Sequence, residues 1–274
     1  MTARIDMYRK TALAVTALAA LTFSTISASA SAPATGGSHA GVNHRGEDHW
    51  GVITRNTIGS PVADLRNGPF GSAGVQGPAA RPPYGRGSLG IEVADHSTSL
   101  TPPSEKVDFG NEVDFYGDPV LGLKRVGFHV FQTDENIAYG GGGANGAKNM
   151  PNIRFEIDPN LAAAPTTHYS TMNWQPDASP VTGEWSPYLD ATTTGSWFLT
   201  GNAGTVTGCD LAGPCTFQEL RTALNDGGAA PTIKTAAVGK GRDYMWIGAV
   251  DGLRINQDVY DFEADGVHRL RRGW

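Results

Sequence analysis

Acidic side chains two residues apart are the feature of this sequence whose type and spacing suit hydrolytic chemistry. Glu156 and Asp158 fall in an alternating run, so in a strand both carboxylates lie on one face. Glycoside hydrolysis needs two carboxylates about 5 to 9.5 Å apart, and Glu184 and Asp190 are further candidates for such a pair. However, Arg154 shares that face, and a half-solvated antiparallel sheet carries charged residues there without catalysis. We therefore assign no catalytic residue.

An aromatic residue among polar ones offers a second kind of chemistry, which is binding. Trp174 ends a strand candidate, next to Asn173 and Gln175 and close to Asp177, at the start of a loop that contains proline. An exposed indole gives a flat apolar surface for a sugar ring, and amide or carboxylate groups at its edge bind the hydroxyls. These four residues form the predicted glycan-binding site.

Other motifs are absent or incomplete. Residues 141–146 match a G-x-G-x-x-G pattern, but no helix follows them within a βαβ unit, so a hairpin loop is the better interpretation. The sequence contains neither a G-x-S-x-G elbow nor an H-E-x-x-H helix. The commonest hydrolase and zinc-protease signatures are thus missing.

The two cysteines, Cys209 and Cys215, are separated by five residues. In an exported protein an even pair this close predicts a disulfide that closes the loop between them. The alternative, a pair of metal ligands, lacks further Cys or nearby His residues.

The N-terminal segment predicts export. Residues 1–30 combine a basic start, an apolar stretch and the small residues Ala28-Ser29-Ala30, as a cleaved signal peptide does. The apolar run is shorter than the roughly 20 residues of a membrane span. Residues 31–49 are polar and glycine-rich, which predicts disorder. We expect a secreted product that begins near Ser31 or Pro33, with no membrane span after cleavage.

The composition of the remaining chain favours an all-β fold. The sequence has 36 Gly and 17 Pro, is 18% charged and shows little helical periodicity, as in proteins with many short strands and turns. The net charge of −6 without a basic cluster argues against nucleic acid as a partner. Residues 242–255 read as a central strand that is apolar on both faces, around which we expect a β-sandwich at 50–256 and a polar tail at 257–274.

Shorter alternating runs predict the other strands, and a capping box predicts one short helix. The helix at 216–225 begins at Thr216 with Glu219 three residues later, and Asn225-Asp226-Gly227 ends it. The predicted strands are 50–53, 88–94, 124–131, 152–158, 169–174, 184–189, 196–199 and 233–238.

The order of several short motifs resembles a known class of domain. Gly87-Ser88-Leu89-Gly90-Ile91, Phe128-His129-Val130-Phe131, the 153–158 run, Gly195-Ser196-Trp197-Phe198, the helix beside the cysteines and Ile247-Gly248-Ala249-Val250-Asp251-Gly252 follow one another as in jelly-roll β-sandwich domains of secreted bacterial proteins. These are similar to carbohydrate-binding modules and galactose-binding-like domains. The resemblance implies that the last long strand lies beside an early one, that the activity is binding, and that a structural calcium ion binds a carboxylate of the final strand, here Asp251.

Three hypotheses for the function remain open. The first is a secreted, non-catalytic module that binds polysaccharide or another cell-surface component. The second is a structural or adhesive domain without a small-molecule site. The third and least favoured is a glycoside hydrolase on a jelly-roll scaffold. An exposed aromatic residue would favour the first, and carboxylates that converge in a cleft would favour the third.

Overall fold

The computed structural model describes residues 49–69, 77–93, 105–133, 149–177, 182–241 and 245–271. The predicted signal peptide, most of the predicted polar segment 31–49 and the glycine-rich run at 141–146 lie outside these residues.

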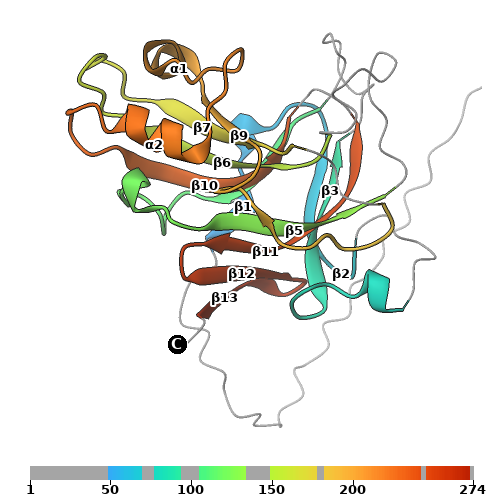
Figure 1. Ribbon diagram of the computed structural model, residues 1–274. Coiled ribbons are helices and arrows are strands. Elements are labelled where there is room, and N and C mark those ends of the chain that lie inside the picture. Colours follow the sequence, from blue (N-terminus) through green and yellow to red (C-terminus); the bar gives the residue numbers. More distant parts are fainter. Residues whose placement is uncertain are drawn as a thin grey trace, which may run out of the picture. The chain divides into compact units, whose positions relative to one another are not determined.

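The fold of the described residues is an antiparallel β-sandwich, as the sequence predicts, with two short α-helices where the sequence predicts one (Figure 1). One sheet has six strands in the order β1-β4-β10-β6-β7-β9. Its strands are β1 (Trp50–Val52), β4 (Val107–Asn111), β6 (Asn152–Asp158), β7 (Ser170–Gln175), β9 (Ser196–Leu199) and β10 (Thr232–Lys240).

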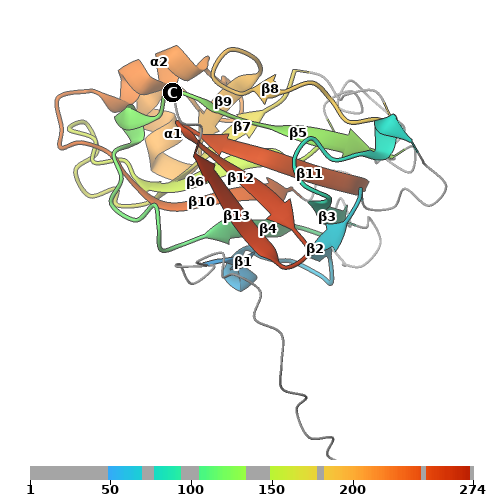
Figure 2. The same cartoon turned by 90° about the horizontal axis from the view of Figure 1, so that it is seen from below.

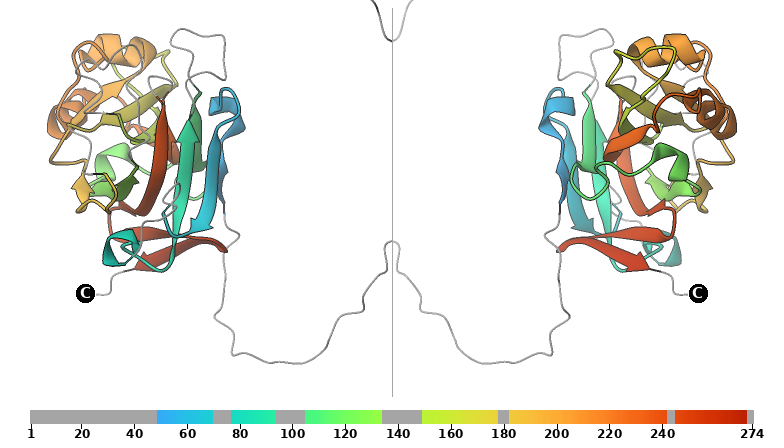
Figure 3. Two further views of the ribbon diagram at one scale, coloured as in Figure 1. Left: turned by 90° about the vertical axis from the view of Figure 1, so that its right-hand side faces the viewer. Right: turned by 90° about the vertical axis from the view of Figure 1, so that its left-hand side faces the viewer.

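The second sheet has seven strands in the order β13-β12-β11-β3-β2, with β5 paired to β11 and β8 paired to β5. Its strands are β2 (Val62–Asn67), β3 (Gly87–Val93), β5 (Val126–Gln132), β8 (Leu189–Asp190), β11 (Trp246–Ile255), β12 (Asp258–Glu263) and β13 (Gly266–Arg271). Figure 2 shows β11, β12 and β13 next to one another, and Figure 3 shows β2, β3 and β11 from the side.

Strand β11 is central to the second sheet, as its apolar faces predict. It pairs with β3 along one edge and with β5 along the other, so the last long strand before the C-terminal hairpin lies beside an early one. Trp246 and Val250 are fully buried in the core that the two sheets share. Burial on both sides explains why almost every residue of this strand is apolar or small.

A β-bulge interrupts β11 at Asp251 and Gly252. Opposite β5, the register of β11 shifts between Asp251 and Arg254, and Gly252 has a φ of +63°. On its other edge, β11 pairs with β3 up to Val250 and with β12 from Leu253 onward. The bulge also reverses which side chains face the core. Strict alternation from Trp246 and Val250 would place Arg254 on the core face, but Leu253 lies there instead.

The two α-helices contact strands β7 and β9, at one edge of the six-stranded sheet. Helix α2 (Phe217–Leu224) begins with the predicted capping box between Thr216 and Glu219. Helix α1 (Gly201–Thr207) follows β9 and has no counterpart in the sequence-based expectations. Three single-turn 3-10 helices complete the elements: η1 (Thr54–Asn56), η2 (Pro78–Ala80) and η3 (Val120–Gly122).

The disulfide between Cys209 and Cys215 is present, with Cα atoms 5.3 Å apart. The loop it closes lies along β9, because Trp197 and Cys215 exchange two backbone hydrogen bonds of 2.7 and 2.8 Å. The disulfide thus fixes the segment that borders the last strand of the six-stranded sheet.

The expectation of a polar tail at 257–274 is wrong for residues 258–271, which form β12 and β13. Asn256, at a φ of +58°, makes the two-residue turn that leads from β11 into β12. Tyr260 and Phe262 then face the core, whereas Asp261 and Glu263 occupy the other face. The sequence here alternates between acidic and aromatic residues, and its high charge led to the prediction of a tail. Two aromatic residues on one face are nevertheless enough to bury that face of a short strand.

Candidate functional site

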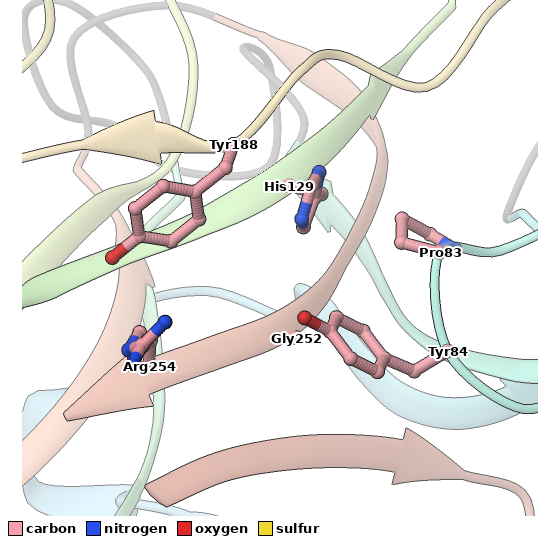
Figure 4. Close-up of a pocket in the computed structure, with 6 residues that line it drawn as sticks. All are labelled: Pro83, Tyr84, His129, Tyr188, Gly252 and Arg254. Carbon is pink, nitrogen blue, oxygen red and sulfur yellow. The ribbon is translucent and has the colours of Figure 1, made fainter. Parts of the chain in front are cut away.

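A cavity of about 420 Å³ lies on the outer face of the second sheet (Figure 4). Ligand pockets usually measure about 300 to 1,000 Å³, so this one suits a small ligand or a single ring. The residues that line it come from four separate segments of the chain: Pro83, Tyr84, His129, Tyr188, Gly252 and Arg254.

The first wall comes from the loop that precedes β3. The backbone N–H of Tyr84 donates to Asp251 Oδ2 at 3.0 Å, and the N–H of Arg86 donates to Glu263 Oε1 at 2.6 Å. These two carboxylates fasten the loop across β11 and β12. Tyr84 is thereby held directly above Gly252, where an added Cβ would lie only 2.4 Å from the Tyr84 ring.

The opposite wall comes from the segment before β8, which lies over β5. Trp185 packs on Phe131 with ring centroids 5.7 Å apart, and the Tyr188 ring lies 5.8 Å from that of His129. Tyr188 can approach the sheet because Gly127 has no side chain, since a Cβ there would be 2.6 Å from the Tyr188 hydroxyl. Trp185 Nε1 also donates to Ala80 O at 3.4 Å, which joins this wall to the first one.

His129 stands between the two tyrosines and presents an acceptor nitrogen. Its Nδ1 lies 3.0 Å from the backbone oxygen of Ser186, which can only accept, so Nδ1 carries the proton. Burial lowers the pKa of His129 below its usual value, although the hydrogen bond to Ser186 opposes this effect. The ring is therefore neutral at pH 7, with Nε2 as an acceptor.

Arg254 supplies the positive charge. Its Nε donates to Asn256 O at 3.0 Å, and its two terminal nitrogens donate to no residue in the described part of the chain. Figure 4 shows its guanidinium and the Tyr188 hydroxyl at the same end of the cavity, and Arg254 acts electrostatically on Tyr188. Burial nevertheless raises the pKa of Tyr188 far above 10, so this phenol stays neutral.

The floor of the cavity is held by Asp251, which the resemblance implied as a calcium ligand. Asp251 is completely buried and accepts hydrogen bonds from the backbone N–H groups of Tyr84, Gly252 and Phe262. Both carboxylate oxygens thus face donors, which would repel a cation. Among the described residues no three His, Cys, Asp or Glu side chains are grouped as metal ligands. Asp251 therefore does not fit a calcium site, and it satisfies backbone groups that the bulge leaves without strand partners.

Burial also determines the protonation of Asp251. Burial raises the pKa of Asp251 to about 7, assisted by the nearby charge of Asp261, while the three N–H donors act in the opposite direction. The pKa of Asp261 is itself raised to about 6, chiefly by burial. The loop that carries Tyr84 therefore rests on a carboxylate that titrates near neutral pH.

The predicted glycan platform at Trp174 is wrong. The Trp174 side chain is 1% exposed, packs edge-on against Phe128, and donates from Nε1 to Thr194 O at 2.8 Å. The proline-containing loop that suggested exposure begins only after Gln175, whereas Trp174 still belongs to the core face of β7.

The three polar neighbours of Trp174 have separate structural contacts. Asn173 is buried and donates to Thr171 O at 3.0 Å, and Gln175 is half-buried at the end of β7. Asp177 is exposed and accepts from the Gly195 N–H at 2.8 Å. None of these residues lines the cavity described above.

The carboxylates considered for hydrolysis are not among the residues that line the cavity. Glu156 is 4% exposed and accepts hydrogen bonds from Asn56 Nδ2 at 3.0 Å, Tyr169 Oη at 2.8 Å and Thr235 Oγ1 at 2.9 Å. Burial tends to raise the pKa of Glu156, but these donors and Arg55 outweigh it and lower the pKa. The expected solvated face is thus covered at this position, and among the described residues no Asp or Glu lines the cavity.

Comparisons with known proteins give no family or relative for this chain. No family model matches it, and neither a curated protein nor a solved structure does. In the part of the chain that the structure describes, no helix is both long and apolar enough to cross a membrane. The function must therefore be argued from the cavity itself.

Proposed function

We propose that this protein is a secreted, non-catalytic β-sandwich that binds an extracellular glycan in the cavity between Tyr84, Tyr188 and His129. The supporting observation is the arrangement of three rings around one open space, with a guanidinium at its end. Aromatic rings remove the apolar face of a sugar from water, and polar groups at their edges take its hydroxyls.

The polar groups of the cavity are complementary to hydroxyls. His129 Nε2 accepts, Arg254 donates, and the Tyr84 hydroxyl, which has no hydrogen-bond partner among the described residues, can do both. The described residues of the wall include no carboxylate. This composition supports binding over hydrolysis, and it replaces Trp174 with a tyrosine pair in the glycan-binding hypothesis.

The binding should be weak. Contact of one sugar ring with a tyrosine buries about 60 Å² of apolar surface, which at about 25 cal/mol per Å² contributes roughly 1.5 kcal/mol, a factor of about ten in affinity. Two such contacts and a few hydrogen bonds place the dissociation constant between about a micromolar and a millimolar.

A glycan array probed with a multivalent form of the protein tests this proposal. The wild type should bind a subset of glycans, and Tyr84→Ala should lose about tenfold in affinity for them without a change in melting temperature, because its ring is only half-buried. Tyr116→Ala is the matched control, since Tyr116 is 71% exposed and lies outside the cavity. Absence of any bound glycan, or equal binding by Tyr84→Ala, would contradict the proposal and favour a structural or adhesive domain.

A further inference from the structure

Building on the proposed function, we infer that the cavity selects an acidic sugar, one whose ring lies between the tyrosines and whose carboxylate binds Arg254. The first observation is the position of this guanidinium, whose single hydrogen bond to Asn256 O uses Nε. The two terminal nitrogens remain for a ligand, and their planar geometry matches a carboxylate with two parallel hydrogen bonds.

The β-bulge explains why the guanidinium of Arg254 lies in the cavity. In an uninterrupted strand Arg254 would alternate with Leu253 onto the opposite face and point into the core. The register shift at Asp251 and Gly252 turns Arg254 outward into the cavity and Leu253 inward. Bulges commonly redirect a side chain beside a functional site. The positive φ of Gly252 and the buried carboxylate of Asp251 thus fix the place of this charge.

The electrostatic surroundings favour a ligand with one negative charge. Of the described residues that line the cavity, only Arg254 is cationic, because burial keeps His129 neutral. Arg125 and Asp190 lie close enough to affect Tyr188 and act on it with opposite signs. Asp251, beneath Gly252, adds a partial negative charge near neutral pH. A phosphate dianion carries two negative charges, and the single guanidinium of Arg254 would balance only one of them in these surroundings. A carboxylate carries one negative charge, which a single guanidinium balances.

The remaining lining fits the rest of such a sugar. The ring edges of Tyr84 and Tyr188 and the Cα of Gly252 are apolar, while His129 Nε2 can accept from a ring hydroxyl. A hexuronate has these parts: a ring with an apolar face, several hydroxyls and one carboxylate. A neutral hexose would leave the terminal nitrogens of Arg254 without an anionic partner after their desolvation, which weakens binding.

The test compares oligogalacturonate with its fully methyl-esterified form by isothermal titration calorimetry. The ester keeps the sugar ring and removes the charge. The wild type should bind the acid about tenfold to hundredfold more tightly, the range for hydrogen bonds to a charged group. Arg254→Gln should bind both forms equally weakly, and Arg254→Lys should recover part of the preference, since it keeps the charge but not the two parallel hydrogen bonds. Arg66→Gln, on β2, is the control variant and should retain the full preference for the acid over the ester.

The possible failures are distinguishable. If neutral glycans of the array bind and esterification has no effect, the acidic-sugar inference is overturned while glycan binding stands. If nothing binds, the proposed function itself fails. If sulfated oligosaccharides bind as tightly as the uronate, the assignment of a carboxylate is overturned. If Arg254→Gln melts well below the wild type, the Arg254→Lys variant is used instead, provided that its melting temperature equals that of the wild type. An unchanged preference of Arg254→Lys for the acid over the ester would contradict a role for the two terminal nitrogens of Arg254.

Discussion

At the scale of single residues, the shape of the cavity depends on the bulge at Asp251 and Gly252. Gly252 supplies a left-handed backbone and leaves space for Tyr84, while Asp251 takes up three backbone N–H groups. Asp251 acts on the cavity indirectly, by placing the groups that would touch a ligand, whereas Gly252 both places these groups and lines the cavity itself. Substitutions at these two positions should therefore change stability and affinity together.

Gly252→Ala should destabilise the protein by more than Gly208→Ala. Both glycines have a positive φ, of 63° and 72°, and an alanine in that conformation costs about 1 to 2 kcal/mol. An added Cβ has open space at Gly208 but meets the Tyr84 ring at 2.4 Å in the case of Gly252. We expect an additional loss of about 1 kcal/mol or more in the free energy of unfolding, and weaker glycan binding, for Gly252→Ala alone. Equal losses in urea unfolding of the two variants would show that Tyr84 is not held against Gly252.

Asp251 should make stability depend on pH near neutrality. Its folded pKa of about 7 is raised from 3.8, so its contribution is fully present below about pH 4 and is lost as pH rises through 7. Relative to Asp251→Asn, the wild type should lose roughly 3 kcal/mol of unfolding free energy between pH 5 and 8, because each pKa unit corresponds to about 1.4 kcal/mol. The lowered pKa of His129 has the opposite effect, a loss of stability below about 6.5, and cancels in this comparison because both proteins carry it.

Urea unfolding of both proteins at pH 5, 6, 7 and 8 measures this difference. A constant difference across that range would mean that the three N–H donors outweigh burial and keep Asp251 ionised throughout. The floor of the cavity would then be insensitive to pH.

At the scale of elements, the disulfide loop and the two cavity walls stabilise different parts of the sandwich. The loop from Cys209 to Cys215 borders β9 in the six-stranded sheet, whereas the cavity lies on the outer face of the seven-stranded one. This separation lets stability and binding be changed independently.

Removal of the disulfide in a Cys209→Ser and Cys215→Ser double variant should lower stability without affecting affinity. Closing a loop of about seven residues contributes about 2 kcal/mol on the chain-entropy model, which corresponds to a melting temperature lower by about 4 to 8 °C. Reduction of the wild type should lower its melting temperature equally. A change in glycan affinity on reduction, measured by calorimetry, would contradict the separation of the two sheets' roles.

At the scale of the whole molecule, alternation in the sequence predicted most of the sandwich. Apolar residues at every second position predict β3, β5 and β6, two apolar faces predict β11, and Thr216 with Glu219 predicts the start of α2. β2, β4 and α1 were missed since they are short and rich in small or polar residues, and β12 because Asp258 and Asp261 masked its two buried aromatic residues.

The candidate site could not be predicted from sequence patterns, for a different reason. Its residues belong to four segments far apart in the chain, and only the fold brings Tyr84 to Gly252 and Tyr188 to Gly127. One local signal existed: Leu253 and Ile255 are out of phase with Trp246 and Val250, which indicates a bulge. The prediction that Trp174 is exposed was wrong because the position of a residue next to a loop does not show which face of the strand its side chain occupies.

Trp174 should now behave as a core residue. Its burial against Phe128 predicts that Trp174→Ala costs about 3 to 5 kcal/mol of unfolding free energy. Glycan affinity measured below the melting temperature of this variant should stay within about twofold of the wild type. A stable Trp174→Ala variant with lost affinity would return the binding site to β7.

An NMR titration of the histidine side chains tests whether a ligand binds among Tyr84, His129, Tyr188 and Arg254. With ¹⁵N-labelled histidine and a bound glycan from the array, or oligogalacturonate, the Nε2 signal of His129 should shift and saturate at the dissociation constant found by calorimetry. The signal of His168, whose side chain is 70% exposed outside the cavity, should stay unchanged. Saturable binding that leaves the His129 signal unmoved would contradict the account.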